Sequence, residues 1–293
     1  MFYSRMIKVA AYAKFDLAIH INPKKRLDGY YPVHYIDCQL SLADKLLFEP
    51  KDRDIEVVCD HPEVPKGRDN FIFRAADLLR SNINKNKLGA KITLTKNIPI
   101  KAGFGGGSSD AAATLVGLCK LWKIKLTDNL AENLAKDLGK DFYYSVYGRV
   151  SEVIGNGKDY KVVPIGACLP RFWLVILVPK EDKPSTGWIY EHLKAKNIGY
   201  GFGKIAKLKE AILKKDKIGI LSNLSNDFEK DVSSYFPVID EMKGNLNRLG
   251  ALSAIMAGAG LSVVGFFDSQ KKAQSAKESL EQKYRQVLVT NIN

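Results

Sequence analysis

Apolar and polar residues alternate in several short stretches of the first half of the chain, the pattern of β-strands with one buried face. Two successive strands are predicted within residues 6–22, and further strands within residues 38–50, 54–60, 90–100 and 145–154. Apolar residues at helical spacing predict helices over residues 69–83, with Asp69 at the capping position, and 128–138.

The second half, from about residue 164, opens with a continuous apolar strand within residues 171–180. There follow helices over residues 203–216 and 237–250, two strands around a glycine turn within 251–268, a helix over 269–284 and a strand over 286–292. This order resembles the β-α-β-β-α-β arrangement of ferredoxin-like folds. We therefore predict an α+β protein with two domains, residues 1–163 and 164–293, for which 293 residues are long enough.

Composition is that of a globular protein, with 46% apolar residues. No run of about 18 apolar residues predicts a transmembrane helix, and the first twenty residues do not resemble a signal peptide. A cytoplasmic location is expected, as a monomer or homodimer. The four cysteines and four histidines are dispersed, which fits neither a zinc site nor a disulfide framework.

The net charge of +13 suits phosphorylated small molecules, nucleic acid or an anionic membrane. The lysines are scattered between apolar residues, a distribution that also fits a solvated surface. We expect a small-molecule substrate and no nucleic-acid or membrane partner.

Four glycines in five positions precede two serines and an aspartate in "KAGFGGGSSDAA", residues 101–112. The stretch matches neither a Walker A loop nor a dinucleotide-binding turn. Gly103, Gly105, Gly106 and Gly107 allow positive φ and close approach, and Ser108, Ser109 and Asp110 open a helix. Its apolar face is Leu115, Leu118, Cys119 and Trp122. Because the free amides of a helix N-terminus attract anions, the loop predicts a phosphate site.

"PIKAGFGGGSSDAAA" resembles the second motif of the GHMP kinase superfamily, P-x-x-x-G-L-G-G-G-S-S-D/N-A-A. "AYAKFDLAIHI" and "ALSAIMAGAGLSVVGFF" are similar to its first and third motifs. Four more segments resemble the 4-diphosphocytidyl-2-C-methyl-D-erythritol kinase family: "LDGYYPVHYIDCQLSLADKL", "LGKDFYYSVYG", "SNDFEKDV", and "KPSTGWIY", which is similar to G-V-S-T-x-x-x-Y. These matches occur in order and cover nearly the whole chain.

The resemblance implies a domain like the second domain of ribosomal protein S5, followed by a ferredoxin-like domain. It implies transfer of the γ-phosphoryl of ATP to the 2-hydroxyl of 4-diphosphocytidyl-2-C-methyl-D-erythritol, a step of non-mevalonate isoprenoid synthesis. Two alternatives stay open. One is a GHMP kinase for a different small alcohol or phosphorylated alcohol, and the other is a non-catalytic nucleotide- or nucleic-acid-binding protein.

The resemblance also assigns residues to roles. Lys14 and Asp141 are the implied catalytic pair. The implied nucleotide-side residues, with Ser108 also a candidate Mg²⁺ ligand, are Gly103, Gly105, Gly106, Gly107, Ser108, Ser109, Asp110, Lys96 and Asn70. The implied acceptor-side residues are Asp16, Tyr30, Tyr31, Tyr190, Gly258 and Gly260.

The chain also departs from the family pattern. Tyr31 stands where the family has a histidine, Asp16 replaces an asparagine, and Lys140 replaces a small residue before Asp141. In the third motif, Ala257, Ala259 and Leu261 replace residues with hydroxyl groups, and Tyr143 replaces a proline. These departures bear mainly on which acceptor is used.

Overall fold

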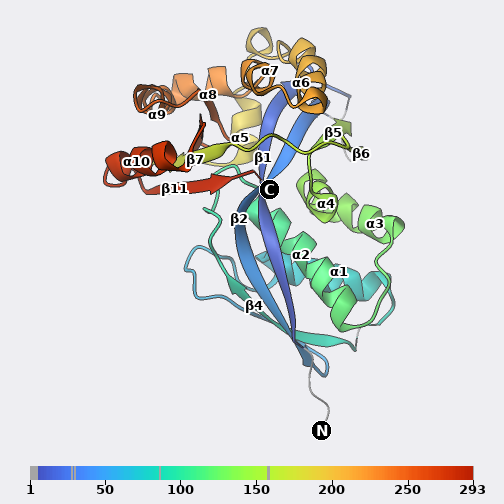
Figure 1. Ribbon diagram of the computed structural model, residues 1–293. Coiled ribbons are helices and arrows are strands. Elements are labelled where there is room, and N and C mark those ends of the chain that lie inside the picture. The colour runs from blue at the N-terminus through green and yellow to red at the C-terminus, as the bar shows by residue number, and fades with distance from the viewer. Residues whose placement is uncertain (1–5, 28, 30, 86, 157–158, 293) are drawn as a thin grey trace. The chain divides into compact units, whose positions relative to one another are not determined.

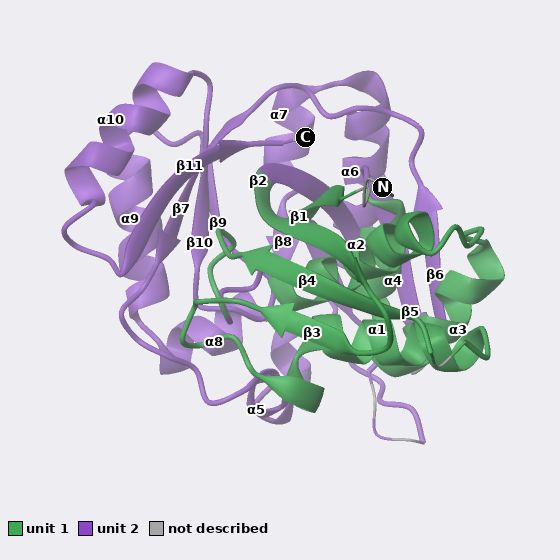
Figure 2. Ribbon diagram, turned by 90° about the horizontal axis from the view of Figure 1, so that it is seen from below, with its two compact units in different colours: residues 1–14, 42–100, 105–148 green, residues 15–41, 101–104, 149–293 purple. Residues whose placement is uncertain are grey.

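A computed structural model describes residues 6–27, 29, 31–85, 87–156 and 159–292. The chain forms two compact units (Figure 2), of which unit 1 comprises residues 1–14, 42–100 and 105–148 and unit 2 comprises residues 15–41, 101–104 and 149–293. Both units are discontinuous because two long strands, β1 (Ile7–Ile21) and β2 (Val33–Lys51), pass from one to the other. The boundary at residues 163 and 164 stays a prediction.

Unit 1 pairs the second part of β2 with β4 (Gly89–Thr95) in antiparallel register, and β4 with β3 (Ile55–Val58) in parallel register. Helices α1 and α2 pack side by side, as do α2 and α4 (Figure 1). The helices of unit 1 are η1 (Gly67–Asp69), α1 (Phe71–Asn82), α2 (Gly106–Leu121), α3 (Asp128–Leu138) and α4 (Lys140–Tyr147).

The start of α1 lies one residue later than predicted. Asn70, not Asp69, is the N-cap, because the Asn70 side chain accepts a hydrogen bond from the backbone N–H of Ile72. Asp69 lies in the short helix η1 before it. The predicted helix over residues 128–138 is confirmed, with Thr127 as its N-cap.

In unit 2, four antiparallel strands form a sheet with the order β11-β7-β10-β9. These strands are β7 (Trp173–Val178), β9 (Ser253–Met256), β10 (Val263–Phe267) and β11 (Gln286–Asn291). Helices α9 (Val238–Arg248) and α10 (Gln270–Leu280) pack against it. This chain order and strand order are those of a ferredoxin-like fold, so the α+β prediction is confirmed.

The rest of unit 2 is built around the end of β1, which pairs with β8 (Ser225–Asn226), and the start of β2, which pairs with β5 (Ser151–Asn156). Strand β6 (Asp159–Pro164) pairs with β5. The remaining helices are α5 (Thr186–Glu191), η2 (Ala195–Asn197), α6 (Phe202–Lys214), α7 (Lys217–Ser222) and α8 (Glu229–Tyr235).

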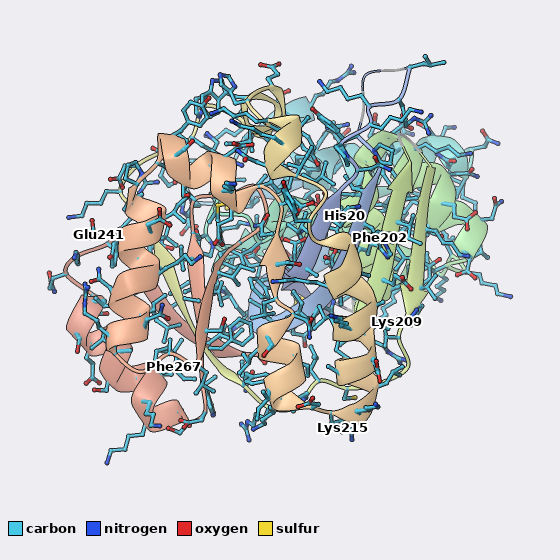
Figure 3. The ribbon with its side chains drawn as sticks, turned by 90° about the horizontal axis from the view of Figure 1, so that it is seen from above. His20, Phe202, Lys209, Lys215, Glu241 and Phe267 are labelled. Atoms are coloured by element: carbon cyan, nitrogen blue, oxygen red, sulfur yellow. The ribbon has the colours of Figure 1, made fainter. Side chains whose placement is uncertain are left out.

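Polar side chains attach α6 to the strands of unit 2. Glu152 on β5 accepts hydrogen bonds from Lys209 of α6 at 2.6 Å and pairs with His34 of β2 at 2.7 Å. At the other end of α6, the ring of Phe202 lies 5.2 Å from the ring of His20, whose Nδ1 is 3.4 Å from an oxygen of Asp227 (Figure 3). These contacts hold α6 against strands β1 and β5.

Two strand predictions are corrected. The two successive strands expected within residues 6–22 are the single strand β1. The strand expected over residues 145–154 begins only at Ser151, because residues 145–147 form the last turn of helix α4. Among the described residues, no helix combines the length and the apolar character needed to cross a membrane.

Candidate active site

The glycine-rich loop turns the chain into α2 through two left-handed residues, Gly103 with φ 98° and Gly105 with φ 63°. Gly105 is the N-cap of α2, and the helical ladder begins with the Ser109 N–H, which donates to the Gly105 carbonyl at 2.9 Å. The amides of Gly106, Gly107 and Ser108 precede that first bond, so the helix itself offers them no acceptor. A helix start of this geometry can accept an anion, and the phosphate site stays a prediction.

Lys14 and Asp141, predicted from segments 127 positions apart, lie together in unit 1, with 3.8 Å between Lys14 Nζ and Asp141 Oδ1. The Lys14 side chain is 6% exposed, and that of Asp141 is 32% exposed. Lys14 packs against Gly105, where an added Cβ would lie 2.8 Å from Lys14 Cγ. The structure therefore places the implied catalytic pair beside the N-terminus of α2.

Lys140 is a second cation at Asp141, with Nζ 2.6 Å from Oδ1. Burial alone would raise the pKa of Asp141, but the ammonium groups of Lys14 and Lys140 outweigh it and lower that pKa below its ordinary value. Asp141 is thus a carboxylate, partly open to solvent and ionised at neutral pH. The sequence showed Lys140 as a departure from the family without indicating this contact.

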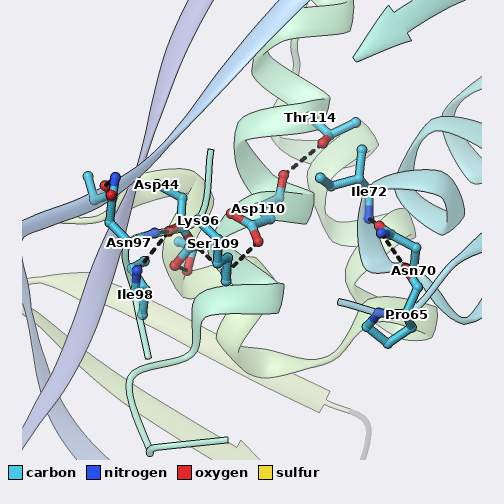
Figure 4. A network of polar contacts seen from close by, with 12 residues as sticks. Asp44, Pro65, Asn70, Ile72, Lys96, Asn97, Ile98, Ser109, Asp110 and Thr114 are labelled. Carbon is cyan, nitrogen blue, oxygen red and sulfur yellow. Dashed lines mark hydrogen bonds and ion pairs between the residues drawn. The ribbon is translucent and has the colours of Figure 1, made fainter. Parts of the chain in front are cut away.

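Asp110 and Lys96 form a buried cluster with Asp44 (Figure 4). Lys96 Nζ donates to Asp110 at 2.8 Å and to Asp44 at 2.5 Å, and Asp44 also accepts from the backbone N–H groups of Asn97 and Ile98. Burial raises the pKa of Asp110 to about 7, since the effect of Lys96 in lowering it is smaller. The cluster joins α2 to the end of β4. The sequence did not predict this structural contact for Asp110 or for Lys96.

Ser109, Ser108 and Asn70 differ in what remains available to a ligand. Ser109 Oγ is buried and donates to the Tyr12 carbonyl at 2.7 Å, which ties α2 to β1. The Asn70 side chain accepts from Ile72 N–H and donates to the Pro65 carbonyl, so it caps α1 (Figure 4). Ser108 is half-buried in the first turn of α2, among the amides described above.

In unit 2, the third-motif turn packs against the residues that lead into the glycine loop. A Cβ on Gly260 would lie 2.5 Å from the Ala102 carbonyl oxygen, and one on Gly258 would lie 3.1 Å from both the Gly103 carbonyl and Asp16 Oδ2. Gly258 has φ 55°, which favours glycine. Asp16 is buried on β1.

Asn226, on β8, holds this turn through its side chain, a role that the sequence did not indicate. Its side-chain amide donates to the carbonyls of Met256 at 2.9 Å and Gly258 at 2.8 Å. The motif "SNDFEKDV" contained Asn226 without suggesting which groups it contacts.

Two of the predicted tyrosines face one another in unit 2. The rings of Tyr31 and Tyr190 are 6.3 Å apart between centroids and inclined by 23°, towards the wide end of the range for stacked rings. The Tyr190 hydroxyl is 3.3 Å from that of Tyr35, and Lys25 Nζ lies 4.8 Å from the Tyr31 centroid. Tyr30 lies outside the described residues.

Unit 2 also contains a cavity of about 320 Å³ that none of the predicted site residues lines. Its walls come from the start of α6, from β8 and α8, and from β9. Among the residues that the structure describes, no three histidine, cysteine, aspartate or glutamate side chains converge as a metal site.

Comparison with known proteins identifies the family. The model of the GHMP kinases N-terminal domain matches residues 70–149, and that of the GHMP kinases C-terminal domain matches residues 208–286. A 4-diphosphocytidyl-2-C-methyl-D-erythritol kinase of Caldanaerobacter subterraneus is 36% identical over 97% of this chain and 96% of its own length. A kinase of the same name from a Geobacillus species is 35% identical, with the same coverage.

Solved structures agree. A crystal structure of 4-(cytidine 5'-diphospho)-2C-methyl-D-erythritol kinase is 28% identical, with a TM-score of 0.82 over 98% of this chain and 99% of that one. The mevalonate kinase of Methanococcus jannaschii, at 16% identity, shares the fold, with a TM-score of 0.71 over 100% of this chain and 98% of that one. The chain belongs to the GHMP kinase superfamily and, within it, to the family of 4-diphosphocytidyl-2-C-methyl-D-erythritol kinases.

Proposed function

We propose that the protein transfers the γ-phosphoryl group of ATP to the 2-hydroxyl of 4-diphosphocytidyl-2-C-methyl-D-erythritol, in the non-mevalonate route to isoprenoid precursors. The observation that carries the proposal is the Lys14–Asp141 pair beside Gly105, at the start of α2. The identity of the acceptor comes from the names of relatives whose sequences match nearly the whole chain. The reaction forms a bond between the acceptor oxygen and the γ-phosphorus, breaks the bond to the bridging oxygen, and releases ADP.

Asp141 is suited to orient the acceptor hydroxyl and take its proton late. An alcohol has a pKa near that of water, about 15.7, whereas an aspartate lies near 4, so the carboxylate does not ionise the hydroxyl in advance. A loose phosphoryl-transfer transition state requires positioning and charge neutralisation more than a strong base. Lys14 favours the negative charge that develops on the oxygen and keeps Asp141 ionised.

The first turn of α2 supports nucleotide binding. The amides of Gly106, Gly107 and Ser108 would hold the β- and γ-phosphates, because helix N-termini favour anions. Gly103 and Gly105 give the loop its left-handed turns. Ser109, Asp110, Lys96 and Asn70, which the resemblance implies on the nucleotide side, would act indirectly, because each one holds other protein groups.

Mg²⁺ fits this turn as an ion held mostly by the nucleotide. The described residues offer no group of three or more His, Cys, Asp or Glu side chains that could hold the ion, and Asp110 is already engaged by Lys96. The half-buried Ser108 hydroxyl is a hard oxygen ligand of the kind Mg²⁺ accepts alongside phosphates and water. When bound, the ion would neutralise charge on the transferred phosphoryl group.

The residues that the resemblance assigns to the acceptor belong to unit 2. Tyr31 and Tyr190, with Tyr30 as the resemblance implies, provide aromatic faces for a cytosine ring. Asp16, Gly258 and Gly260 gather at the third-motif turn and are assigned to the polyol or its phosphates. We further propose that the enzyme is cytoplasmic, acts as a monomer or homodimer, and binds neither a membrane nor nucleic acid.

The test is an assay of ADP release by the purified protein with ATP, Mg²⁺ and the acceptor. Turnover is expected in the wild type, and Asp141→Asn is expected to lower kcat by about 10²- to 10⁴-fold. Asp137→Asn, an exposed aspartate on α3, is the matched control and should keep wild-type kcat. No turnover of this acceptor, together with phosphorylation of a different alcohol, would refute the proposed acceptor. An unchanged kcat in Asp141→Asn would refute the role of Asp141.

A further inference from the structure

Lys183 lies between β7 and α5, at a position where the family segment G-V-S-T-x-x-x-Y has glycine. Its ammonium group donates to the Ala259 carbonyl at 2.5 Å and to the Thr186 hydroxyl at 3.1 Å. The side chain thus spans from the start of α5 to the third-motif turn. Lys183 is not among the residues that the family resemblance assigns to a role.

The positive charge of Lys183 faces no carboxylate partner in the part of the chain that the structure describes. Among the residues that the structure describes, no carboxylate forms an ion pair with it, and the neighbouring Asp182 is paired with Arg285 at 2.8 Å. Burial lowers the pKa of Lys183 to about 8. A half-buried cation without a partner is costly, and an anion brought to it by a ligand would remove that cost.

An ammonium group has three N–H donors, and the two protein contacts of Lys183 use two of them. The turn it touches has lost the hydroxyl groups of the family motif, because Ala257 and Ala259 stand in their place. Lys183 therefore brings a charged donor to a turn where alanines replace two of the family's hydroxyl-bearing residues.

The surroundings of Lys183 indicate which anion it would meet. Seven residues further along the same segment, Tyr190 on α5 faces Tyr31. A nucleotide whose base lies against these rings carries its phosphates on the adjoining ribose. The third-motif turn, with Gly258 against Asp16, is in the same unit as both tyrosines.

We propose that Lys183 binds the diphosphate of the cytidine-linked acceptor and determines affinity for that part of the substrate. The inference rests on the proposed function for the identity of the acceptor.

The experiment compares binding of cytidine diphosphate and of cytidine to the full-length protein by calorimetry. Lys183→Met is expected to weaken cytidine diphosphate binding by about 10- to 100-fold, as for loss of a charged hydrogen bond, and to change cytidine binding by less than about threefold. Lys183→Arg should restore most of the affinity. Lys180→Met, an exposed lysine of the same loop, should match the wild type.

Equal losses for cytidine and cytidine diphosphate would show a merely structural role and overturn the proposal. ADP is titrated in parallel, and a loss of ADP affinity in Lys183→Met with unchanged cytidine diphosphate affinity would also overturn the proposal, because Lys183 would then act on the ATP side. If Lys183→Met does not fold, as judged by thermal unfolding, Lys183→Gln is measured under the same criteria. Absence of acceptor turnover in the wild type would count against the proposed function, whereas the binding comparison judges Lys183 by itself.

Discussion

Lys14 Nζ lies 3.8 Å from Asp141 Oδ1, and the stem of the same lysine packs on Gly105, the left-handed N-cap of α2. The cation, the carboxylate and the phosphate-binding turn therefore belong to one packed arrangement in unit 1. Because the stem of Lys14 contacts Gly105 and its ammonium group faces Asp141, a side chain added at Gly105 is expected to change the distance between Lys14 and Asp141.

Gly105→Ala is predicted to lower kcat by about tenfold or more, since the added Cβ meets Lys14 Cγ and displaces its ammonium group. Gly67→Ala is the matched control: Gly67 has the same φ of 63° and nothing within 4 Å of an added Cβ. Both variants bear the backbone strain of a left-handed alanine, about 1–2 kcal/mol. Equal kcat values in the two variants, measured alongside their unfolding free energies, would contradict the steric link.

Lys140→Met is predicted to shift the acid limb of the kcat profile to higher pH. Lys14 and Lys140 together hold the pKa of Asp141 below its ordinary 3.8, so the wild type loses activity only as pH falls through that lowered value. Removing the nearer cation raises this pKa, and kcat then begins to fall at a higher pH. Lys136→Met, an exposed lysine on α3, should leave the profile in place. Coincident acid limbs for Lys140→Met and the wild type would count against the assignment.

Tyr190→Leu is predicted to raise KM for the cytidine-linked acceptor by about 5- to 100-fold, because a base stacked on an aromatic ring gains roughly 1–3 kcal/mol. Tyr190→Phe keeps the ring and loses only the 3.3 Å contact with the Tyr35 hydroxyl, so its KM should stay close to that of the wild type. KM for ATP is the internal reference and should not change. A rise in KM for ATP alone would remove Tyr190 from the acceptor side.

Lys96→Met is predicted to lower the free energy of unfolding by about 3–5 kcal/mol, since it leaves the carboxylates of Asp44 and Asp110 buried without their cation. Lys91→Met, on β4 shortly before Lys96, breaks only an exposed pair with Glu49 and should cost about 1 kcal/mol or less. Urea unfolding measures both variants. If their losses agree within 1 kcal/mol, the buried cluster does not stabilise the start of α2 as described.

Much of the fold could be predicted from periodicity, because its strands and helices carry regular apolar faces. The ferredoxin-like order of β7, β9, β10 and β11 is an example. The local pattern predicted the bounds of a strand wrongly where long-range strand pairing or a reversal of the chain sets those bounds. Strand β1 runs without a break through Lys14 and Asp16, and Gly148 ends α4 before β5 can begin.

The candidate site was predicted only in part, and for a physical reason. Positive-φ glycines and an α2 N-terminus can be inferred from local sequence. The partners of Lys96 and Lys183 cannot, since Asp44 lies 52 residues from Lys96 and Ala259 lies 76 residues from Lys183. Lys14 and Asp141 were indicated by family resemblance, and no local feature marks either of them as unusual.

The most direct measurement is phosphorus NMR of the product formed from ATP and 4-diphosphocytidyl-2-C-methyl-D-erythritol by the wild-type protein. The account predicts a new phosphomonoester resonance, with a carbon-coupled assignment to the 2-hydroxyl, that forms together with ADP and is lost in Asp141→Asn. ADP formation without a phosphorylated acceptor, or a phosphate placed on another hydroxyl, would contradict it.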